Sequence, residues 1–327
     1  MRAIITGING FVGRHLASYL IEKEYEVWGT TRQTSIMAIH SLPWNILSVD
    51  LNDENQLIKH LNEIRPDYIF HLSGQSSVKK SWENVKDTFQ SNVDHTISLL
   101  EAIKKSDVSA SVKIITVGSS EEYGKVPTDM MPIKESTPLQ PISPYGVSKA
   151  SVSMLAQHYY NAYGIRIVHA RPFNHIGPMQ RIGFVASDFA KQIAEIEFGL
   201  KAPLIEVGNL NSERDFCDVR DIVSAYESLL KNARFGEIYN VCSGKPVTIR
   251  FILEQYISFS TFSNIEVREN QALHRPVDYP RYYGDPTKIH EQTGWSNRIA
   301  IKQSLEDILN YWRTEISSNS KEYSRNV

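Results

Sequence analysis

Three glycines close to the amino terminus constrain the fold of this chain more than any other feature. They lie in the segment Thr6-Gly7-Ile8-Asn9-Gly10-Phe11-Val12-Gly13, between an apolar run at residues 3–6 and a helical pattern at residues 13–23. Glycine allows a sharp turn and a close approach of the backbone to a ligand, and the N–H groups that begin a helix bind anions. The alternative is that these three glycines only mark an ordinary turn. The flanking strand and helix favour a loop in which Gly7, Gly10, Phe11, Val12 and Gly13 bind the pyrophosphate of a dinucleotide.

Short β-branched runs alternate with longer helical patterns through the first two-thirds of the chain. This alternation is typical of βαβ units in a parallel sheet. The predicted strands are residues 3–6, 26–30, 67–72, 113–118, 166–170 and 238–241. We therefore predict an α/β fold of the Rossmann type, with a doubly wound parallel sheet.

The length of 327 residues suits one Rossmann domain and a smaller partner domain. Proline and glycine gather at residues 173–178, 244–246 and 275–286, so we expect the chain to cross between domains several times. We predict an NADP-binding Rossmann domain at 1–172 plus about 217–243, and a discontinuous α/β domain at about 173–216 plus 244–327. A cleft between two domains suits a bipartite substrate.

The composition excludes several classes of partner. The formal net charge of −2 gives no basic field, so we expect no nucleic-acid partner. No apolar run approaches the roughly 20 residues that span a bilayer, and the first residues already read as a buried strand, so we expect no membrane association and no signal peptide. The two cysteines, Cys217 and Cys242, have no histidine cluster nearby, which predicts reduced thiols in a cytoplasmic protein and no metal site.

The end of the second predicted strand bears on the choice of dinucleotide. An acidic residue there binds the ribose 2′-hydroxyl of NAD, but this strand ends in Thr30-Thr31-Arg32. A guanidinium at Arg32 would bind the 2′-phosphate of NADP(H), although a solvated turn arginine is the alternative. The pair Asp50-Leu51 follows another short strand and is a candidate adenine contact or an ordinary loop. NADP(H) is the expected cofactor.

A tyrosine and a lysine provide the candidate catalytic pair. Tyr145 and Lys149 are four residues apart in Pro144-Tyr145-Gly146-Val147-Ser148-Lys149, which opens a long helical pattern, so both lie on one helical face. An ammonium beside a phenol stabilises phenolate. A pKa near 7 instead of 10 requires about 4 kcal/mol, which one close, partly desolvated cation and the positive charge of the nicotinamide could supply together. With such a pKa, Tyr145 could exchange a proton with a substrate oxygen while hydride moves at the attached carbon.

A serine-rich turn follows the strand predicted at residues 113–118. Its sequence is Gly118-Ser119-Ser120-Glu121-Glu122-Tyr123-Gly124. Open α/β sheets bind ligands at the carboxyl ends of their strands, so Ser119 could share the substrate oxygen with Tyr145. Glu121 is either a second acid/base or a solvent-facing carboxylate.

The ordered set of motifs resembles the extended short-chain dehydrogenase/reductases, a family of nucleotide-sugar epimerases, dehydratases and reductases. The resemblance covers nearly the whole chain and is carried by the glycine loop, His71-Leu72-Ser73-Gly74, Asn92-Val93, the turn at 119–124, the segment 145–149, Arg171-Pro172-Phe173-Asn174, Arg214-Asp215-Phe216, residues 218–221 and Arg275-Pro276-x-Asp278-x-Pro280. Within the family, the chain is most similar to the reductases of GDP-6-deoxy-4-keto-mannose and next to the GDP-mannose 4,6-dehydratases. An arginine-rich segment found in the dehydratases is not evident after Arg32, which favours a reductase and a dimer.

The resemblance implies a role for each matching residue. Ser119, Tyr145 and Lys149 would be catalytic, with Lys149 also binding the nicotinamide ribose. The resemblance implies that Asn174 and Arg214 contact the diphosphate of a sugar nucleotide, that Arg275 contacts its distal part, and that Ser120 adjoins the substrate. Structural ion pairing is the alternative for both arginines.

The leading hypothesis is NADPH-dependent reduction of a GDP-linked 4-keto-6-deoxy sugar, either a hexose or a heptose. The alternatives are GDP-mannose 4,6-dehydration, in which Glu121 would be a base, and 4-epimerisation of a nucleotide sugar. A non-catalytic sensor of the same fold is a further alternative, which the presence of both Tyr145 and Lys149 disfavours. The resemblance also implies a homodimer that pairs through helices at residues 87–104 and 149–163.

Overall fold

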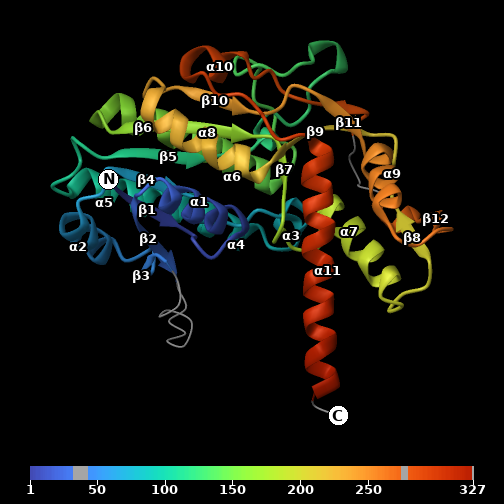
Figure 1. Cartoon of the computed structure of the whole chain (residues 1–327). Coiled ribbons are helices and arrows are strands. Elements are labelled where there is room, and N and C mark those ends of the chain that lie inside the picture. Colours follow the sequence, from blue (N-terminus) through green and yellow to red (C-terminus); the bar gives the residue numbers. More distant parts are fainter. Residues whose placement is uncertain (32–42, 274–278, 326–327) are drawn as a thin grey trace.

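The main sheet has seven parallel strands in the order β10-β6-β5-β4-β1-β2-β3 (Figure 1). The computed structural model of the protein describes residues 1–31, 43–273 and 279–325. The strands are β1 (Arg2–Thr6), β2 (Glu26–Thr31), β3 (Asn45–Ser48), β4 (Tyr68–His71), β5 (Lys113–Val117), β6 (Arg166–Pro172) and β10 (Ile238–Val241). The order reverses between β1 and β4, as in a doubly wound sheet. The predicted α/β Rossmann fold is confirmed.

Helices cover both faces of this sheet. The core of one face is built with α1 (Phe11–Glu22), α8 (Val219–Asn232) and α10 (Thr287–Thr293), and that of the other with α2 (Glu54–Ile64), α5 (His95–Lys105) and α6 (Pro144–Tyr163). Successive strand residues point to opposite faces, so Ile5 packs in the first core and Ile4 in the second. Both faces are therefore buried, which explains the continuous apolar strands.

The helical stretch before α5 contains a wider turn. It comprises α3 (Val78–Glu83), α4 (Val85–Phe89) and a π-helical turn at Gln90–Asp94 that runs directly into α5. A π turn inserts an extra residue into a helix and re-aims its side chains. Asn92 lies in this turn, and its Nδ2 donates to Ser148 Oγ of α6 at 2.9 Å.

A second, smaller unit has its own sheets and core. One sheet contains β7 (Asn174–Ile176), β9 (Glu213–Asp218), β11 (Pro246–Thr248) and β13 (Arg281–Tyr282), and β8 (Leu204–Val207) pairs with β12 (Glu266–Glu269). The helices α7 (Val185–Glu197), α9 (Ile249–Phe259) and the long α11 (Ile301–Arg325) complete this unit. Their apolar faces form a third core, on the right in Figure 1.

Short 3-10 turns lie at Ser120–Glu122, Thr128–Met130 and Gln271–Leu273.

The division of the chain into domains stays a proposal. We keep the Rossmann part at 1–172 plus about 217–243 and the second part at about 173–216 plus 244–327, with one change. Ile289 of α10 and Trp295 are buried in a core of the main sheet, and α10 packs against α8 and β10. We therefore propose that the segment around α10 belongs to the Rossmann part, so that the chain crosses between the parts twice more than expected, once before α10 and once before α11.

Candidate active site

The glycine loop joins β1 to α1 in a very close arrangement. Gly7 has a φ of +73°, a conformation that favours glycine, and Gly10 N donates to Gly7 O at 2.9 Å. A Cβ on Gly13 would lie 2.5 Å from Gly7 O, so no side chain fits there. Gly13 thus lies inside the first turn of α1, and the helix begins at Phe11, two residues earlier than the pattern at 13–23 predicted.

The N-terminus of α1 suits an anionic ligand. Gly10 is its N-cap residue, no side chain caps the helix, and the first turn carries no acidic residue. The N–H groups of Phe11, Val12 and Gly13 therefore have neither a capping side-chain acceptor nor a repelling carboxylate. These features fit the pyrophosphate of a dinucleotide.

The adenosine side of the candidate cofactor site is only partly described. Arg32 lies outside the described residues. Asp50 is exposed, and its Oδ1 accepts from Asn52 N at 3.0 Å in a local turn. Leu51 is buried in the core that packs against α2 and α5, so its side chain serves packing and only its backbone could contact an adenine.

Helix α6 carries the predicted tyrosine and lysine in its first two turns. Ser143 caps the helix, with its Oγ accepting from Gly146 N at 3.0 Å, and Pro144 occupies the first helical position. Tyr145 is 8% exposed, and the Lys149 Nζ lies 5.9 Å from the centroid of its ring. The predicted shared helical face is confirmed.

The electrostatics of Tyr145 differ from the sequence expectation. Burial raises the pKa of Tyr145 well above its ordinary value; a hydrogen bond with Ser119 lowers it in part, and the carboxylate of Glu121 raises it further. Desolvation of the phenolate opposes the expected lowering towards 7, which relies on the positive charge of a bound nicotinamide as well as on Lys149 and stays a prediction. Tyr145 is a phenol at neutral pH, which is the form that can donate a proton.

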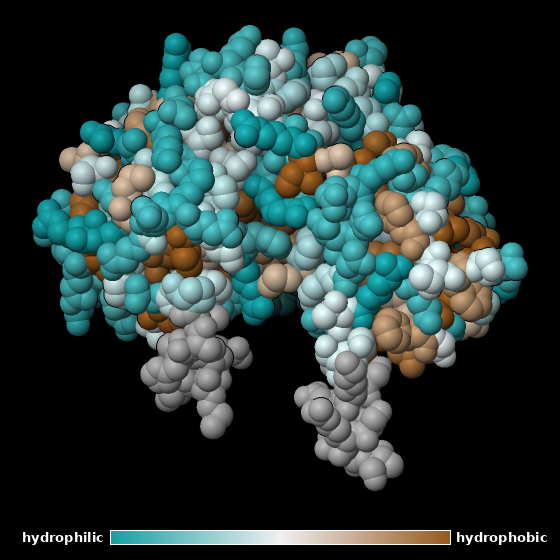
Figure 2. All heavy atoms as spheres, in the orientation of Figure 1, coloured by the Kyte–Doolittle hydropathy of each residue, from teal (hydrophilic) through white to brown (hydrophobic). Residues whose placement is uncertain are grey.

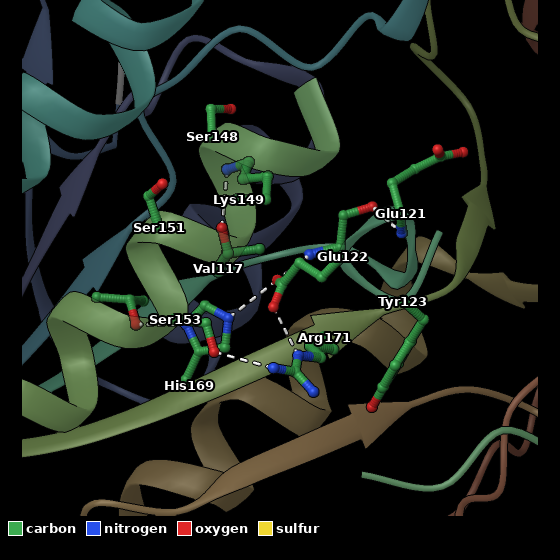
Figure 3. Close-up of polar contacts among 12 residues, drawn as sticks. Val117, Glu121, Glu122, Tyr123, Ser148, Lys149, Ser151, Ser153, His169 and Arg171 are labelled. Carbon is green, nitrogen blue, oxygen red and sulfur yellow. Dashed lines mark hydrogen bonds and ion pairs between the residues drawn. The ribbon is translucent and has the colours of Figure 1, made fainter. Parts of the chain in front are cut away.

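The pKa of Lys149 lies well below the ordinary value for a lysine. Its Nζ donates to Val117 O at the end of β5, at 2.8 Å (Figure 3). Burial lowers the pKa of Lys149 to about 8, against the opposing effect of the Glu122 carboxylate. A Cβ on Gly74 would lie 3.7 Å from this Nζ, so the loop after β4 also borders the lysine.

Ser119 is the second residue after β5 and caps the 3-10 turn Ser120–Glu122. Its Oγ accepts from Glu121 N at 3.2 Å, and its side chain lies near enough to the phenol to lower the pKa of Tyr145 in part. The structure thus brings together Ser119, Tyr145 and Lys149, as the sequence predicted. Glu121 is partly buried and influences the pKa of Tyr145, so it lies at the same site.

A buried polar cluster behind Ser119 was missed by the sequence reasoning. Glu122 is fully buried; its Oε2 accepts from Arg171 Nε at 2.6 Å, and its Oε1 lies 3.1 Å from His169 Nε2 (Figure 3). A signal for this cluster was present: His169 and Arg171 are two residues apart in an otherwise apolar strand, so they point to the same face. Two large polar residues on a buried face require a partner, which Glu122 supplies.

The candidate substrate residues lie on the second unit or at its border. Asn174 is exposed on β7, and its Nδ2 donates to Asp215 O at 2.9 Å. Arg214 lies on β9, where its Nη1 donates to the carbonyls of Glu213 and Tyr279. Since β7 and β9 pair directly, with Asn174 opposite Phe216, the two residues lie close together.

The remaining two substrate predictions have different outcomes. Ser120 is buried, and its backbone carbonyl accepts from Tyr282 OH at 2.8 Å, which joins the turn after β5 to β13. Arg275 lies outside the described residues.

The Rossmann sheet, the glycine loop and the Ser119–Tyr145–Lys149 cluster define an extended short-chain dehydrogenase/reductase. More narrowly, the chain belongs to the family whose model is described as GDP-mannose 4,6 dehydratase, which matches residues 4–308.

Individual relatives within and around this family differ in activity. The chain is 36% identical to the GDP-6-deoxy-D-mannose reductase of Pseudomonas aeruginosa, over 96% of this chain and 98% of the relative. It is 29% identical to the human GDP-mannose 4,6 dehydratase, over 94% of this chain and 90% of the relative.

The solved structures that match this chain also differ in activity. The structure of RMD from Pseudomonas aeruginosa complexed with NADPH matches with a TM-score of 0.82 at 35% identity, over 96% of this chain and 99% of that chain. The UDP-glucose 4-epimerase of Thermotoga maritima matches with a TM-score of 0.85 at 25% identity, over 97% of this chain and 100% of that chain. The fold alone therefore does not separate reduction from epimerisation.

The lowered pKa of Lys149 predicts a pH dependence of stability. The folded protein releases this proton near pH 8, whereas an unfolded lysine keeps it until about pH 10.5. Between these values the unfolded chain binds more protons, so the free energy of unfolding rises with pH. Relative to Lys149→Met, which cannot titrate, the wild type should gain about 2 kcal/mol between about pH 7.5 and about pH 9.5 in urea unfolding. An equal pH dependence of both proteins would contradict the assignment.

Proposed function

We propose that the protein is an NADPH-dependent 4-keto reductase of a GDP-linked 4-keto-6-deoxy sugar, either a hexose or a heptose. The observation that carries this proposal is the buried phenol of Tyr145, which lies near Ser119 and Lys149 at the carboxyl edge of the sheet. The similarity to a GDP-6-deoxy-D-mannose reductase along almost the whole of both chains supports the direction and the substrate class.

Residues of the Rossmann part would hold the cofactor. The N–H groups of Phe11, Val12 and Gly13 would bind its pyrophosphate, and Lys149 its nicotinamide ribose. Arg32 remains our candidate for the 2′-phosphate. When bound, NADPH supplies the hydride for C4 of the sugar.

The residues around the keto group would manage the oxygen and its proton. Ser119 would donate a hydrogen bond to the keto oxygen and fix its position, while Tyr145 donates its proton to that oxygen as negative charge develops. The raised pKa of Tyr145 suits this direction, because the phenol is fully protonated before the reaction. Lys149, charged below about pH 8, would stabilise the phenolate that remains.

The second unit would bind the rest of the substrate. Asn174 and Arg214 lie on paired strands, and a diphosphate requires fixed donors of this kind. Each now donates to a backbone carbonyl, so we propose that these contacts exchange for phosphate oxygens when the substrate binds. Arg275 would contact the distal part of the sugar nucleotide, and Ser120 would border the sugar.

A specific observation favours one second candidate, GDP-mannose 4,6-dehydration. The carboxylate of Glu121 lies close enough to Tyr145 to raise its pKa, so a base stands beside the acid. A dehydratase would need this base at C5, whereas a reductase would not.

Cofactor stoichiometry separates the two activities. We expect net oxidation of NADPH when a GDP-4-keto-6-deoxy sugar is supplied, and no 4-keto product when GDP-mannose and NADP⁺ are supplied instead. Tyr145→Phe should lower kcat by about 10³-fold or more because the proton donor is lost, while NADPH affinity changes little. Formation of a 4-keto sugar from GDP-mannose without net cofactor change would instead identify a dehydratase.

We also propose a homodimer that pairs through α5 and α6. These helices are joined by the hydrogen bond from Tyr159 OH to Glu101 Oε1 at 2.7 Å. Large apolar side chains are exposed on them: Ile97 at 36%, Val147 at 40% and Met154 at 60%. Val147 and Met154 are seven residues apart and share one helical face, which suits packing against a second copy.

A charge within this face should prevent pairing. We expect Met154→Glu to convert a dimer into a monomer in sedimentation equilibrium, because the carboxylate would be buried without a partner. The matched control is Leu200→Glu, since Leu200 is 65% exposed but lies three residues after the end of α7, in the second unit. A monomeric wild type, or dissociation by the control as well, would contradict the proposed interface.

We further propose that the enzyme works in the cytoplasm. Cys217 and Cys242 are both unpaired and buried, as expected for a protein of a reducing compartment. Within the described ranges, no helix is both long and apolar enough to cross a membrane.

A further inference from the structure

The buried carboxylate of Glu122 connects the two segments that carry the catalytic groups. Its Oε1 accepts from the backbone N–H of Ser119 at 2.9 Å, which completes a reciprocal capping arrangement with the Ser119 hydroxyl. Its Oε2 accepts from Arg171, whose Nη2 in turn donates to Ser153 Oγ of α6 at 3.0 Å. One carboxylate is therefore bonded both to Ser119 and, through the guanidinium of Arg171, to α6. Figure 3 shows the connection from Glu122 through Arg171 to Ser153.

The position of Ser153 shows which face of α6 this connection reaches. Ser153 is four residues after Lys149 and eight after Tyr145, so all three lie along one face of α6. Arg171 thus holds the face of the helix from which the phenol and the ammonium project. Its guanidinium also lies 4.8 Å from the ring centroid of Tyr123, which limits its movement.

We propose that Glu122 is a positioning residue, which fixes Ser119 relative to Tyr145 and Lys149 through its bonds to the Ser119 N–H and to Arg171. This proposal rests on the proposed function only in giving Ser119 and Tyr145 their catalytic roles. Glu122 itself contacts none of the reacting atoms. Glu121, by contrast, extends away from the buried cluster (Figure 3).

The residues around Glu122 leave space for its carboxylate and keep it charged. A Cβ on Gly118 would lie 1.8 Å from Glu122 Oε1 and 2.3 Å from His169 Nε2, so glycine at this position makes room for the pair. His169 is itself held by Thr116 Oγ1 at 2.9 Å on the neighbouring strand β5. Although burial raises the pKa of Glu122, His169, Arg171 and the Ser119 N–H bring it below its ordinary value, so the carboxylate is charged.

Glu122→Gln removes the charge and leaves the volume unchanged. An amide has one acceptor oxygen, so it cannot accept from Arg171 Nε and the Ser119 N–H with different oxygens as the carboxylate does. If the glutamine oxygen stays with Arg171, its NH₂ group faces the Ser119 N–H, and Ser119 loses its anchor. Glu122→Asp keeps the charge but is one methylene too short to reach both partners.

The test is a double-mutant cycle between Glu122→Gln and Ser119→Ala, with single-turnover rates and NADPH affinity measured at each corner. We expect Glu122→Gln to lower the rate by about 30-fold in the wild-type background and by less than about 3-fold in Ser119→Ala, at unchanged NADPH affinity. The cycle is repeated with Glu122→Asp, which should behave alike and which replaces Glu122→Gln if that variant does not fold.

A second buried carboxylate provides the matched control. Glu227 is 3% exposed and accepts from Tyr19 OH and Tyr25 OH between α1, β2 and α8, away from Ser119. Glu227→Gln should lower the melting temperature as Glu122→Gln does, with little effect on the rate. A purely structural role for Glu122 would make the two variants equivalent.

The outcomes separate this proposal from the proposed function. Equal losses from Glu122→Gln in both backgrounds, or no loss in either, would overturn the positioning role. If the wild type fails to reduce a GDP-4-keto sugar but dehydrates GDP-mannose, the proposed function is wrong. The cycle is then run in the dehydration assay, where the same non-additivity is expected.

Discussion

Parallel strands end at one edge of their sheet, and this constraint assembles the whole site. The glycine loop follows β1, the loop of Gly74 follows β4, Ser119 follows β5 and Asn174 follows β6. Residues more than a hundred positions apart therefore meet at one edge because of the sheet topology. The hydrogen bond from Lys149 to Val117 O and the bonds of Glu122 then fix details within an arrangement that the sheet has already set.

Burial governs the chemistry of the groups at this edge. It raises the pKa of Tyr145 and lowers that of Lys149, so desolvation disfavours the charged form of both. Glu122 is the contrasting case, because His169 and Arg171 outweigh its burial and keep it charged. The site thus combines an uncharged proton donor, Tyr145, with the buried ion pair of Glu122 and Arg171. This combination suits the protonation of an oxygen on which negative charge develops.

The sequence predicted those features that follow from local pattern. Strand alternation, the glycine loop and the Tyr145–Lys149 face all depend on short-range spacing, and the predicted parallel sheet is confirmed. The structure places the glycine loop between β1 and α1, Tyr145 and Lys149 on α6, and Ser119 near Tyr145, while their roles in binding and catalysis stay predictions. The early start of α1, the pKa of Tyr145 and the cluster around Glu122 depend on packing between distant segments, which spacing does not report. Glu122 lies in the serine-rich turn at residues 118–124, which the sequence indicates as part of the site. Its burial and its partners on β6, however, are set by tertiary structure.

In a 4-keto reductase, hydride passes from NADPH to C4 of the GDP-linked sugar. Isotope transfer follows this step: the enzyme is given NADPH that carries deuterium at the transferable position, and the sugar nucleotide is examined by mass spectrometry and NMR. We expect one deuterium at C4 of the product for each NADPH oxidised. A product without deuterium at C4, formed while NADPH is not consumed, would contradict it.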